Sequence, residues 1–373
     1  MMSNSNEHFQ FTDERFADLQ MLRYRLNGFE DLTLSQQIYI YCLAKATLMG
    51  RDITFDQQGK YNLRIRKTLE AIYKHYDGDR TSDDFKALEV YLKRVWFSSG
   101  IYHHYGCEKF KPGFSEHFFY EAVSMMPETE LPLKRGETKE DLLDELVPVI
   151  FDEEILPKRV NQTDGVDLVA TSACNFYEGV TQNEVERFYA KLKDGEDLTP
   201  PSYGLNSKLM KRNGEIVEMT WKEDGMYGTA IKEITSWLLK AQKYAENEQQ
   251  AHVIDLLIKY YRTGDLSDFD RYSIAWVKQQ EGMVDFINGF IEVYGDPLGL
   301  KGTWEGLVEF KDMKATRRTQ AISQNAQWFE DHSPVAPQFK KAEVKGVTAH
   351  VICAAMLGGD EYPASAIGIN LPN

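Results

Sequence analysis

The sequence of 373 residues has no long hydrophobic run, few cysteines and a shortage of basic residues. No stretch of 18 consecutive apolar residues occurs, so we expect no membrane-spanning helix. With 43 basic against 58 acidic residues the net charge is −15. This charge argues against nucleic acid and anionic membranes as partners, because binding to phosphates needs a basic face. The cysteines are widely spaced and form no C-x-x-C pair, so we expect free thiols at Cys42, Cys107, Cys174 and Cys353.

The amino-terminal residues M-M-S-N-S-N-E-H lack both the basic start and the apolar stretch of a signal peptide. We therefore expect a cytoplasmic protein. A periplasmic or lipoprotein-anchored location is the alternative if a leader has been removed. Apolar residues make up 42% and aromatic residues 12% of the chain, which is typical of a globular protein of one or two domains.

Local patterns predict a mainly helical chain with a few strands. Thr33-x-x-Gln36 and Thr181-x-x-Glu184 read as capping boxes that open helices. Two strand-like runs flank Asn213-Gly214, which favours a β-hairpin over 207–221. The charged run 304–329 is expected to be helical and the run 347–355 to be a buried strand. Further helices are expected over 62–76, 83–97, 115–126, 138–150, 227–245 and 248–262.

The stretch that carries chemistry is Phe286–Gly299, F-I-N-G-F-I-E-V-Y-G-D-P-L-G. It places a carboxylate, Glu292, two residues before a phenol, Tyr294. The alternation of apolar and polar residues predicts a short strand whose polar face is directed toward a cleft. The strand should break at Gly295-Asp296-Pro297, because proline cannot continue a central strand.

The last eight residues, A-I-G-I-N-L-P-N, add two side-chain amides, Asn370 and Asn373, and a glycine, Gly368, that lets a ligand approach the backbone. One acid, one phenol and two amides suit a site for a cationic amine at a peptide end. The same residues are also common at ordinary strand ends and turns.

Five further stretches support a family assignment together with these two. The chain resembles the dipeptidyl peptidase III family of zinc exopeptidases, and within it the Bacteroides-like bacterial branch most. The resemblance runs from about Phe16 to Asn373 and corresponds to the N-terminal portion of a family member. The five stretches are V-W-F-S-S-G-I-Y-H-H-Y-G-C-E-K-F-K-P from Val95, T-S-A-C-N-F-Y-E-G-V-T from Thr171, Y-G-L-N-S-K-L from Tyr203, Y-R-T-G-D-L from Tyr261 and A-Q-W-F-E-D-H-S-P-V from Ala326.

The resemblance implies an α+β fold, predominantly helical, with a small β-barrel or antiparallel sheet, as part of a two-lobed metallopeptidase. Residues 1–310 would form the barrel-containing, substrate-binding lobe. Residues 311–353 would be an excursion into the helical zinc lobe. Residues 354–373 would return to the barrel lobe as the amine-binding loop.

The resemblance also implies roles for individual residues. Glu292 would take the ammonium of the peptide, and Asn370 and Asn373 would complete its hydrogen bonds. Tyr294 would contact the substrate near the scissile bond. The backbone from Gly368 would provide a sheet edge for the peptide. Tyr105 would line the cleft, although a packed loop aromatic is an equal interpretation.

None of the eight histidines stands in H-E-x-x-H or in the family's H-E-x-x-G-H motif, and the adjacent His103-His104 are expected to point apart. We therefore expect zinc in the full-length protein, no metal site in this chain, and no activity of this chain alone without a C-terminal catalytic half. The favoured hypothesis is the N-terminal part of a zinc dipeptidyl aminopeptidase whose partners are short peptides with a free amino terminus. The alternatives are a non-catalytic, truncated peptide-binding module and a structural protein with vestigial site residues.

Overall fold

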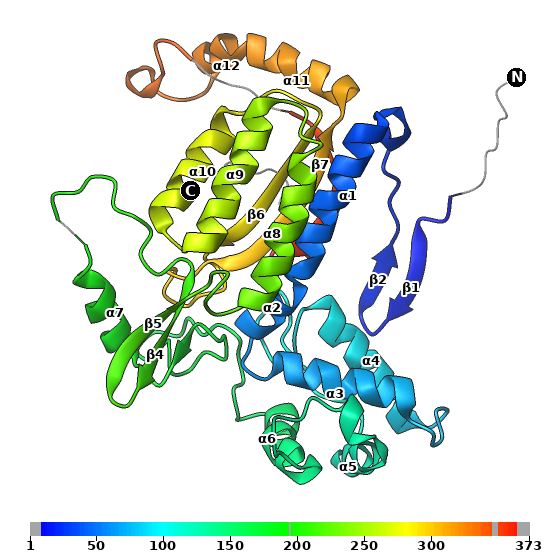
Figure 1. Cartoon of the computed structure of the whole chain (residues 1–373). Coiled ribbons are helices and arrows are strands. Elements are labelled where there is room, and N and C mark those ends of the chain that lie inside the picture. The colour runs from blue at the N-terminus through cyan, green and yellow to red at the C-terminus, as the bar shows by residue number, and fades with distance from the viewer. Residues whose placement is uncertain (1–8, 194, 345–349, 364–373) are drawn as a thin grey trace, which may run out of the picture.

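The computed structural model describes residues 9–193, 195–344 and 350–363. Helices are the main regular structure of these residues, and three small sheets accompany them (Figure 1). The predicted α+β, predominantly helical fold is therefore confirmed. Across the described ranges the sheets are open, so the small antiparallel sheet is present whereas the closed barrel that was its alternative is not.

The largest sheet is antiparallel with the strand order β6-β7-β8. Three long helices cover one of its faces (Figure 1). Their contact buries large aromatic side chains, among them Phe290 and Trp304 of the sheet and Tyr261 of the helices. Burial of such side chains supplies most of the stabilisation of this layer. The strands are Val284–Glu292 (β6), Thr303–Lys311 (β7) and Ile352–Gly359 (β8), and the helices are Leu34–Met49 (α1), Gly228–Gln242 (α8) and Glu248–Thr263 (α9).

Glycines let the backbones of β7 and β8 approach α1 closely. Gly306 and Gly358 are register partners, and a Cβ on either would lie less than 3 Å from side-chain atoms of Thr47. At the end of β8, Gly359 has φ +66°, and a Cβ there would lie 2.1 Å from the carbonyl oxygen of Trp304. Only glycine fits such a position without displacing the backbone.

We expect Gly359→Ala to destabilise the protein more than a change of backbone conformation alone explains. Gly165→Ala is the matched control, because Gly165 also has a positive φ (+80°) but has open space around its Cβ position. The control should lose about 1 kcal/mol of unfolding free energy, and Gly359→Ala about 1–3 kcal/mol more, because its methyl group meets backbone. Urea denaturation measures both values. Equal losses of unfolding free energy in the two variants would mean that the backbone of β8 shifts at this point and makes room for the methyl group.

A second helical layer forms the N-terminal region around its own apolar core. Helix α3 starts immediately after Gly59-Lys60-Tyr61, and α4 starts at a serine cap, Ser82, that accepts the N–H of Phe85. The predicted capping box at Thr33 is present at the start of α1. The helices of this region are Arg51–Gln57 (α2), Asn62–His75 (α3), Asp83–Phe97 (α4), Glu116–Met125 (α5) and Lys139–Phe151 (α6), and a hairpin of Thr12–Phe16 (β1) and Leu19–Leu22 (β2) precedes them.

The third sheet joins a predicted hairpin to a short parallel strand. Its strands are Tyr177–Glu178 (β3), Ser207–Arg212 (β4) and Glu215–Thr220 (β5), next to helix α7, Gln182–Ala190. Asn213 and Gly214 both have positive φ, 51° and 85°, as the predicted two-residue turn requires. The capping box at Thr181 also forms as predicted.

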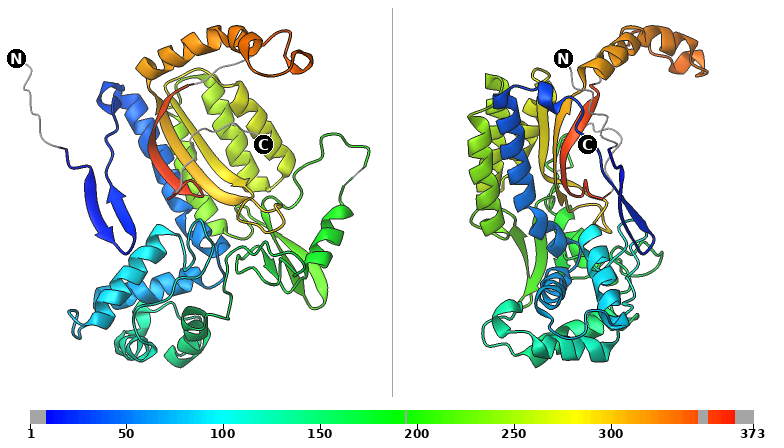
Figure 2. Two further views of the ribbon diagram at one scale, coloured as in Figure 1. Left: turned by 180° about the vertical axis from the view of Figure 1, so that it is seen from behind. Right: turned by 90° about the vertical axis from the view of Figure 1, so that its right-hand side faces the viewer.

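Between β7 and β8 the chain leaves the sheet and forms two helices that extend over one end of it (Figures 1 and 2). They are Met313–Gln324 (α11) and Ala326–His332 (α12). The prediction of helix over 304–329 is therefore wrong in its first third, which is strand β7. The predicted strand over 347–355 starts at Ile352 and runs on to Gly359; residues 345–349 lie outside the described residues.

No helix within the described ranges is both long and apolar enough to cross a membrane. All four cysteines are free, and Cys42 and Cys174 are buried, so the prediction of free thiols is confirmed.

Candidate functional site

Glu292 is the last residue of β6, at the edge of the main sheet. It pairs with Thr303 of β7 after a register shift that separates it from Phe290. The side chain is partly buried, whereas Tyr294, two residues further on, is 81% exposed. The strand thus ends at Glu292, three residues before the predicted break at Gly295, and the side chain of Tyr294 is exposed to solvent.

The turn after β6 is held in place by Asp296, which is 2% exposed. Its carboxylate accepts the N–H groups of Leu300 at 2.8 Å and Lys301 at 3.0 Å, and the phenol of Tyr177 at 2.8 Å. Burial raises the pKa of Asp296 despite these bonds, which lower it. Sequence reasoning treated this aspartate only as part of a break. In the structure it fixes the turn that positions Glu292 and Tyr294.

Three further acidic residues lie close enough to interact electrostatically with Glu292 or with one another. They are Glu305 of β7 and Asp360 and Glu361, which follow β8. Burial, together with the charges of Glu361, Asp360 and Glu292, raises the pKa of Glu305 to about 9. Burial raises the pKa of Asp360 to about 6, and Glu292 and Glu361 contribute. We call these four residues the acid cluster.

Glu305 is the most enclosed member of the acid cluster. It is 2% exposed, and among the described residues its Oε2 atom has no hydrogen-bond partner. An acid with this pKa carries a proton at neutral pH. Glu305, Asp360 and Glu361 were not predicted as site residues from the sequence. The one available signal was the pair of acidic residues Asp360-Glu361, which directly follows Gly358-Gly359 at the end of a strand-like run.

Arg159 connects the acid cluster to the loop that carries Tyr105. Its Nη2 donates to the carbonyl of His104 at 3.1 Å, and its charge lowers the pKa of Asp360 against the effect of burial. The ring of His104 lies 5.1 Å from that of Tyr105 and 5.3 Å from that of Phe97. Tyr105 itself is 75% exposed. The structure thus brings the loop of Tyr105 to the border of the acid cluster, with the phenol free to meet a ligand.

Other predicted site residues fall outside these observations. Gly368, Asn370 and Asn373 lie outside the described residues. The prediction that His103 and His104 point apart is wrong: their rings stack at 4.5 Å with 22° between their planes. The tight turn of this loop, in which the N–H of Gly106 donates to His103 Nδ1 at 3.1 Å, accounts for the stacking.

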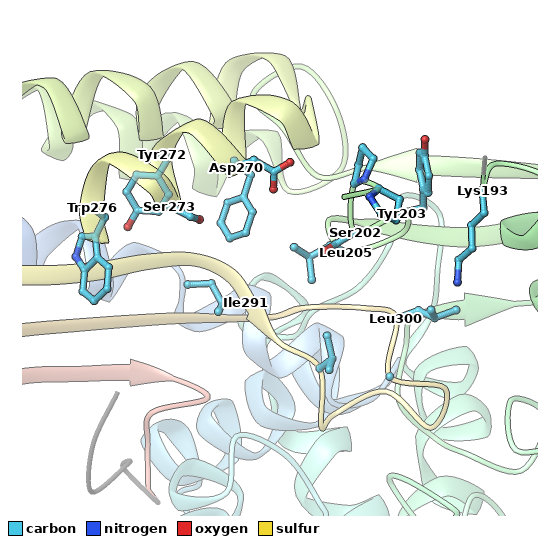
Figure 3. A pocket seen from close by; sticks show the side chains of 15 residues that line it. Lys193, Ser202, Tyr203, Leu205, Asp270, Tyr272, Ser273, Trp276, Ile291 and Leu300 are labelled. Carbon is cyan, nitrogen blue, oxygen red and sulfur yellow. The ribbon is translucent and has the colours of Figure 1, made fainter. Parts of the chain in front are cut away.

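A cavity of about 380 Å³ adjoins the same strand. Aromatic side chains of α10, Leu266–Lys278, form one wall, and Ile291 lies across from them (Figure 3). Val293 also lines the cavity. Asp270 lies at this pocket, and burial together with the charge of Asp265 raises its pKa. The pocket is suited to an apolar group. Ile291 and Glu292 are consecutive residues of the strand, so their side chains point to opposite sides of it. The pocket, which Ile291 lines, therefore opens on a different side of the strand than the acid cluster.

The zinc implied by the resemblance requires a donor set, and none fits it among residues 9–193, 195–344 and 350–363. No three histidine, cysteine, aspartate or glutamate side chains in these ranges are arranged to hold a metal ion. The acid cluster is not such a group either. What the arrangement offers chemically is attraction for a cation, with a phenol and a loop aromatic beside it.

Comparison with known proteins shows what this chain is similar to. Peptidase family M49 matches residues 201–373. Dipeptidyl peptidase 3 of Homo sapiens is 22% identical over 378 residues, covering 93% of this chain and 51% of that protein. Dipeptidyl peptidase 3 of Dictyostelium discoideum is 23% identical over 380 residues, covering 94% of this chain and 52% of that protein. The chain thus spans about half the length of the curated relatives it matches.

Solved structures agree on the fold. DPP III from Caldithrix abyssi matches with a TM-score of 0.64 and 18% identity, covering 94% of this chain and 53% of that chain. Dipeptidyl-peptidase III from Corallococcus sp. strain EGB matches with a TM-score of 0.60 and 15% identity, covering 94% and 52%. These findings confirm the resemblance of this chain to the dipeptidyl peptidase III family, with residues 201–373 matching peptidase family M49.

Proposed function

We propose that this chain is the peptide-binding part of a dipeptidyl peptidase and that it holds the free amino terminus of a short peptide at Glu292. The observation that carries the proposal is the acid cluster. Two of its members, Glu305 and Asp360, have raised pKa values because burial and the repulsion of neighbouring acids disfavour their charged forms. A cation placed at Glu292 would relieve that repulsion. The ammonium of a peptide is a cation of suitable charge and can donate three hydrogen bonds.

Neighbouring residues would complete the recognition. Tyr294, exposed two residues beyond Glu292, would contact the peptide backbone, and Tyr105 would border the bound peptide from the loop held by Arg159. By the family resemblance, Asn370 and Asn373 would accept the remaining protons of the ammonium. The backbone from Gly368 would pair with the peptide as an added strand.

We also propose the domain division expected from the sequence. Residues 1–310 and 354–373 would form the substrate-binding lobe, and residues 311–353 would reach toward a second lobe. In support, β7 ends at Lys311 and β8 starts at Ile352, with α11 and α12 projecting between them (Figure 2). The bacterial branch and the cytoplasmic location remain proposals as well.

The zinc chemistry of a dipeptidyl peptidase would be supplied by residues other than those described here. We expect these 373 residues to bind peptides without releasing dipeptides, because the sequence contains no H-E-x-x-G-H motif. Chromatography of a tetrapeptide after incubation with the chain and zinc tests this expectation. Release of dipeptides would contradict it, whereas tight binding without release would also fit a non-catalytic peptide-binding module.

The acid cluster makes a specific prediction for the binding reaction. An ammonium near Glu305 and Asp360 should lower the pKa of both carboxyl groups, so protons should be released when a peptide binds near neutral pH. Calorimetric titration of a tetrapeptide in buffers of different ionisation enthalpy counts these protons. We expect a net release, which Glu305→Gln should reduce. Binding without proton release would mean that the peptide binds away from the acid cluster, and this result would contradict the proposal.

A further inference from the structure

A second cavity, of about 660 Å³, lies where α2, α3 and the end of α4 meet β8. The contribution of β8 is the four consecutive residues Met356–Gly359. Because side chains of a strand alternate between its faces, four consecutive residues can line one cavity only along the edge of the strand. Among the described strands, β8 is the outer member of the order β6-β7-β8, so its free edge lies along this cavity. Two of the four residues are glycines, which leaves the main chain accessible.

The charge of this cavity is opposite to that of the whole chain. Arg51, Arg66 and Lys74 line it, and Glu70 is the one acidic side chain in the lining. Glu70 is already engaged, since its Oε1 accepts the indole N–H of Trp96 at 2.8 Å and lies 3.4 Å from Arg66 Nε. In a chain with a net charge of −15, such a positive lining attracts anions specifically to one place.

Arg66 anchors the positive charge at the base of the cavity. Its residue exposure is 4%, its Nη2 donates to Asp52 at 2.9 Å, and its guanidinium lies 4.5 Å from the centre of the Phe55 ring. Its Nη1 has no hydrogen-bond partner in the described part of the chain. Asp52 is shared with Arg51, whose Nε lies 3.4 Å away. Three cations thus face two carboxylates, and a buried guanidinium keeps an unmet donor.

We propose that this cavity is an acid-recognition site, which takes the carboxylate of a glutamate or aspartate side chain from an extended polypeptide segment lying along β8. The exposed cations, Arg51 and Lys74, would contact the carboxylate, and Arg66 beneath them would add attraction at low dielectric. The apolar remainder of the segment would lie against Phe55 and Met356, and its main chain would pair with the edge of β8. This site selects a side-chain acid, so it is independent of the amine-binding function proposed for Glu292.

The test uses a probe that cannot use the amine site. A short peptide blocked at both ends, with valine and threonine around one central glutamate, is compared with the same peptide carrying glutamine. We expect the glutamate peptide to bind at least about tenfold more tightly, by fluorescence anisotropy, with affinity that falls as salt is added. Equal affinity of the two peptides, or no binding of either, would overturn the proposal.

Variants of exposed residues complete the test without threatening the fold. Arg51→Gln combined with Lys74→Gln should weaken the glutamate peptide at least about tenfold and leave the glutamine peptide unchanged. Lys67→Gln combined with Lys86→Gln is the matched control, because it also removes two positive charges and both lysines are exposed and do not line the cavity. An equal loss in both variants would show a general charge effect and contradict the site. Binding of inorganic phosphate in a calorimetric titration, with no binding of the glutamate peptide, would show a site for free anions and would also overturn the proposal.

Discussion

Glu292→Gln is expected to abolish the binding of peptides that have a free amino terminus. The substitution keeps the shape of the side chain but removes the charge that pairs with the ammonium. Loss of one partner of a desolvated charge pair costs about 2–5 kcal/mol, so the affinity should fall by at least about 30-fold. Calorimetric titration with a tetrapeptide measures the change. Glu292 lies at the end of an edge strand and is partly exposed, so the variant should fold.

The matched control for this variant is Glu233→Gln, which removes an acidic charge from the exposed surface of α8. It changes the net charge by the same amount and should leave the affinity within about twofold, because exposed charges at a distance are screened by salt. If Glu292→Gln behaved like Glu233→Gln, the ammonium would be held somewhere else.

Glu305 is expected to make the stability of the protein fall as the pH rises. The folded protein keeps a proton on Glu305 up to its pKa of about 9, whereas an unfolded glutamate loses the proton near its ordinary pKa of 4.5. The folded state therefore binds more protons in between. Stability is greatest at low pH within this window and falls by up to about 1.4 kcal/mol per pH unit as the pH rises toward the folded pKa.

Glu305→Gln isolates this contribution, because glutamine stays neutral in both states. Asp360 and Glu309, with pKa values of about 6 and about 7, act in the same direction but have mostly titrated by about pH 7.5. Urea denaturation between about pH 7.5 and about pH 9 should give a markedly smaller slope for the variant and a higher stability at the upper end. An unchanged slope would mean that Glu305 is ionised in the folded protein.

Local chemistry allowed much of the fold to be predicted from the sequence. Capping boxes at Thr33 and Thr181 and the turn at Asn213-Gly214 are short-range signals, and all three form as expected. The strand β7 was mistaken for helix because Glu305 and Glu309 gave the run a charged appearance. Their burial arises from pairing with β6 and β8, which only the folded chain brings together.

The candidate site could be predicted only in part, because local patterns reveal some of its residues and only the fold brings in the others. Glu292 and Tyr294 stand at a strand end that the alternation and the following proline indicate. Asp296 was seen as a break, although its carboxylate organises the turn through three main-chain or phenol donors. Glu305 comes from β7 and Asp360 follows β8, and no local pattern links them to Glu292. A buried acid without a cationic partner is recognisable only when its surroundings in space are known.

The most direct test of the account compares a tetrapeptide with its N-acetylated form in calorimetric titrations against the chain of 373 residues. Acetylation removes the ammonium and leaves the rest of the peptide intact. If the acid cluster at Glu292 holds the amino terminus, the free peptide should bind at least about 30-fold more tightly than the acetylated one. Equal affinities would show that the amino terminus is not recognised, and would contradict the proposed role of Glu292.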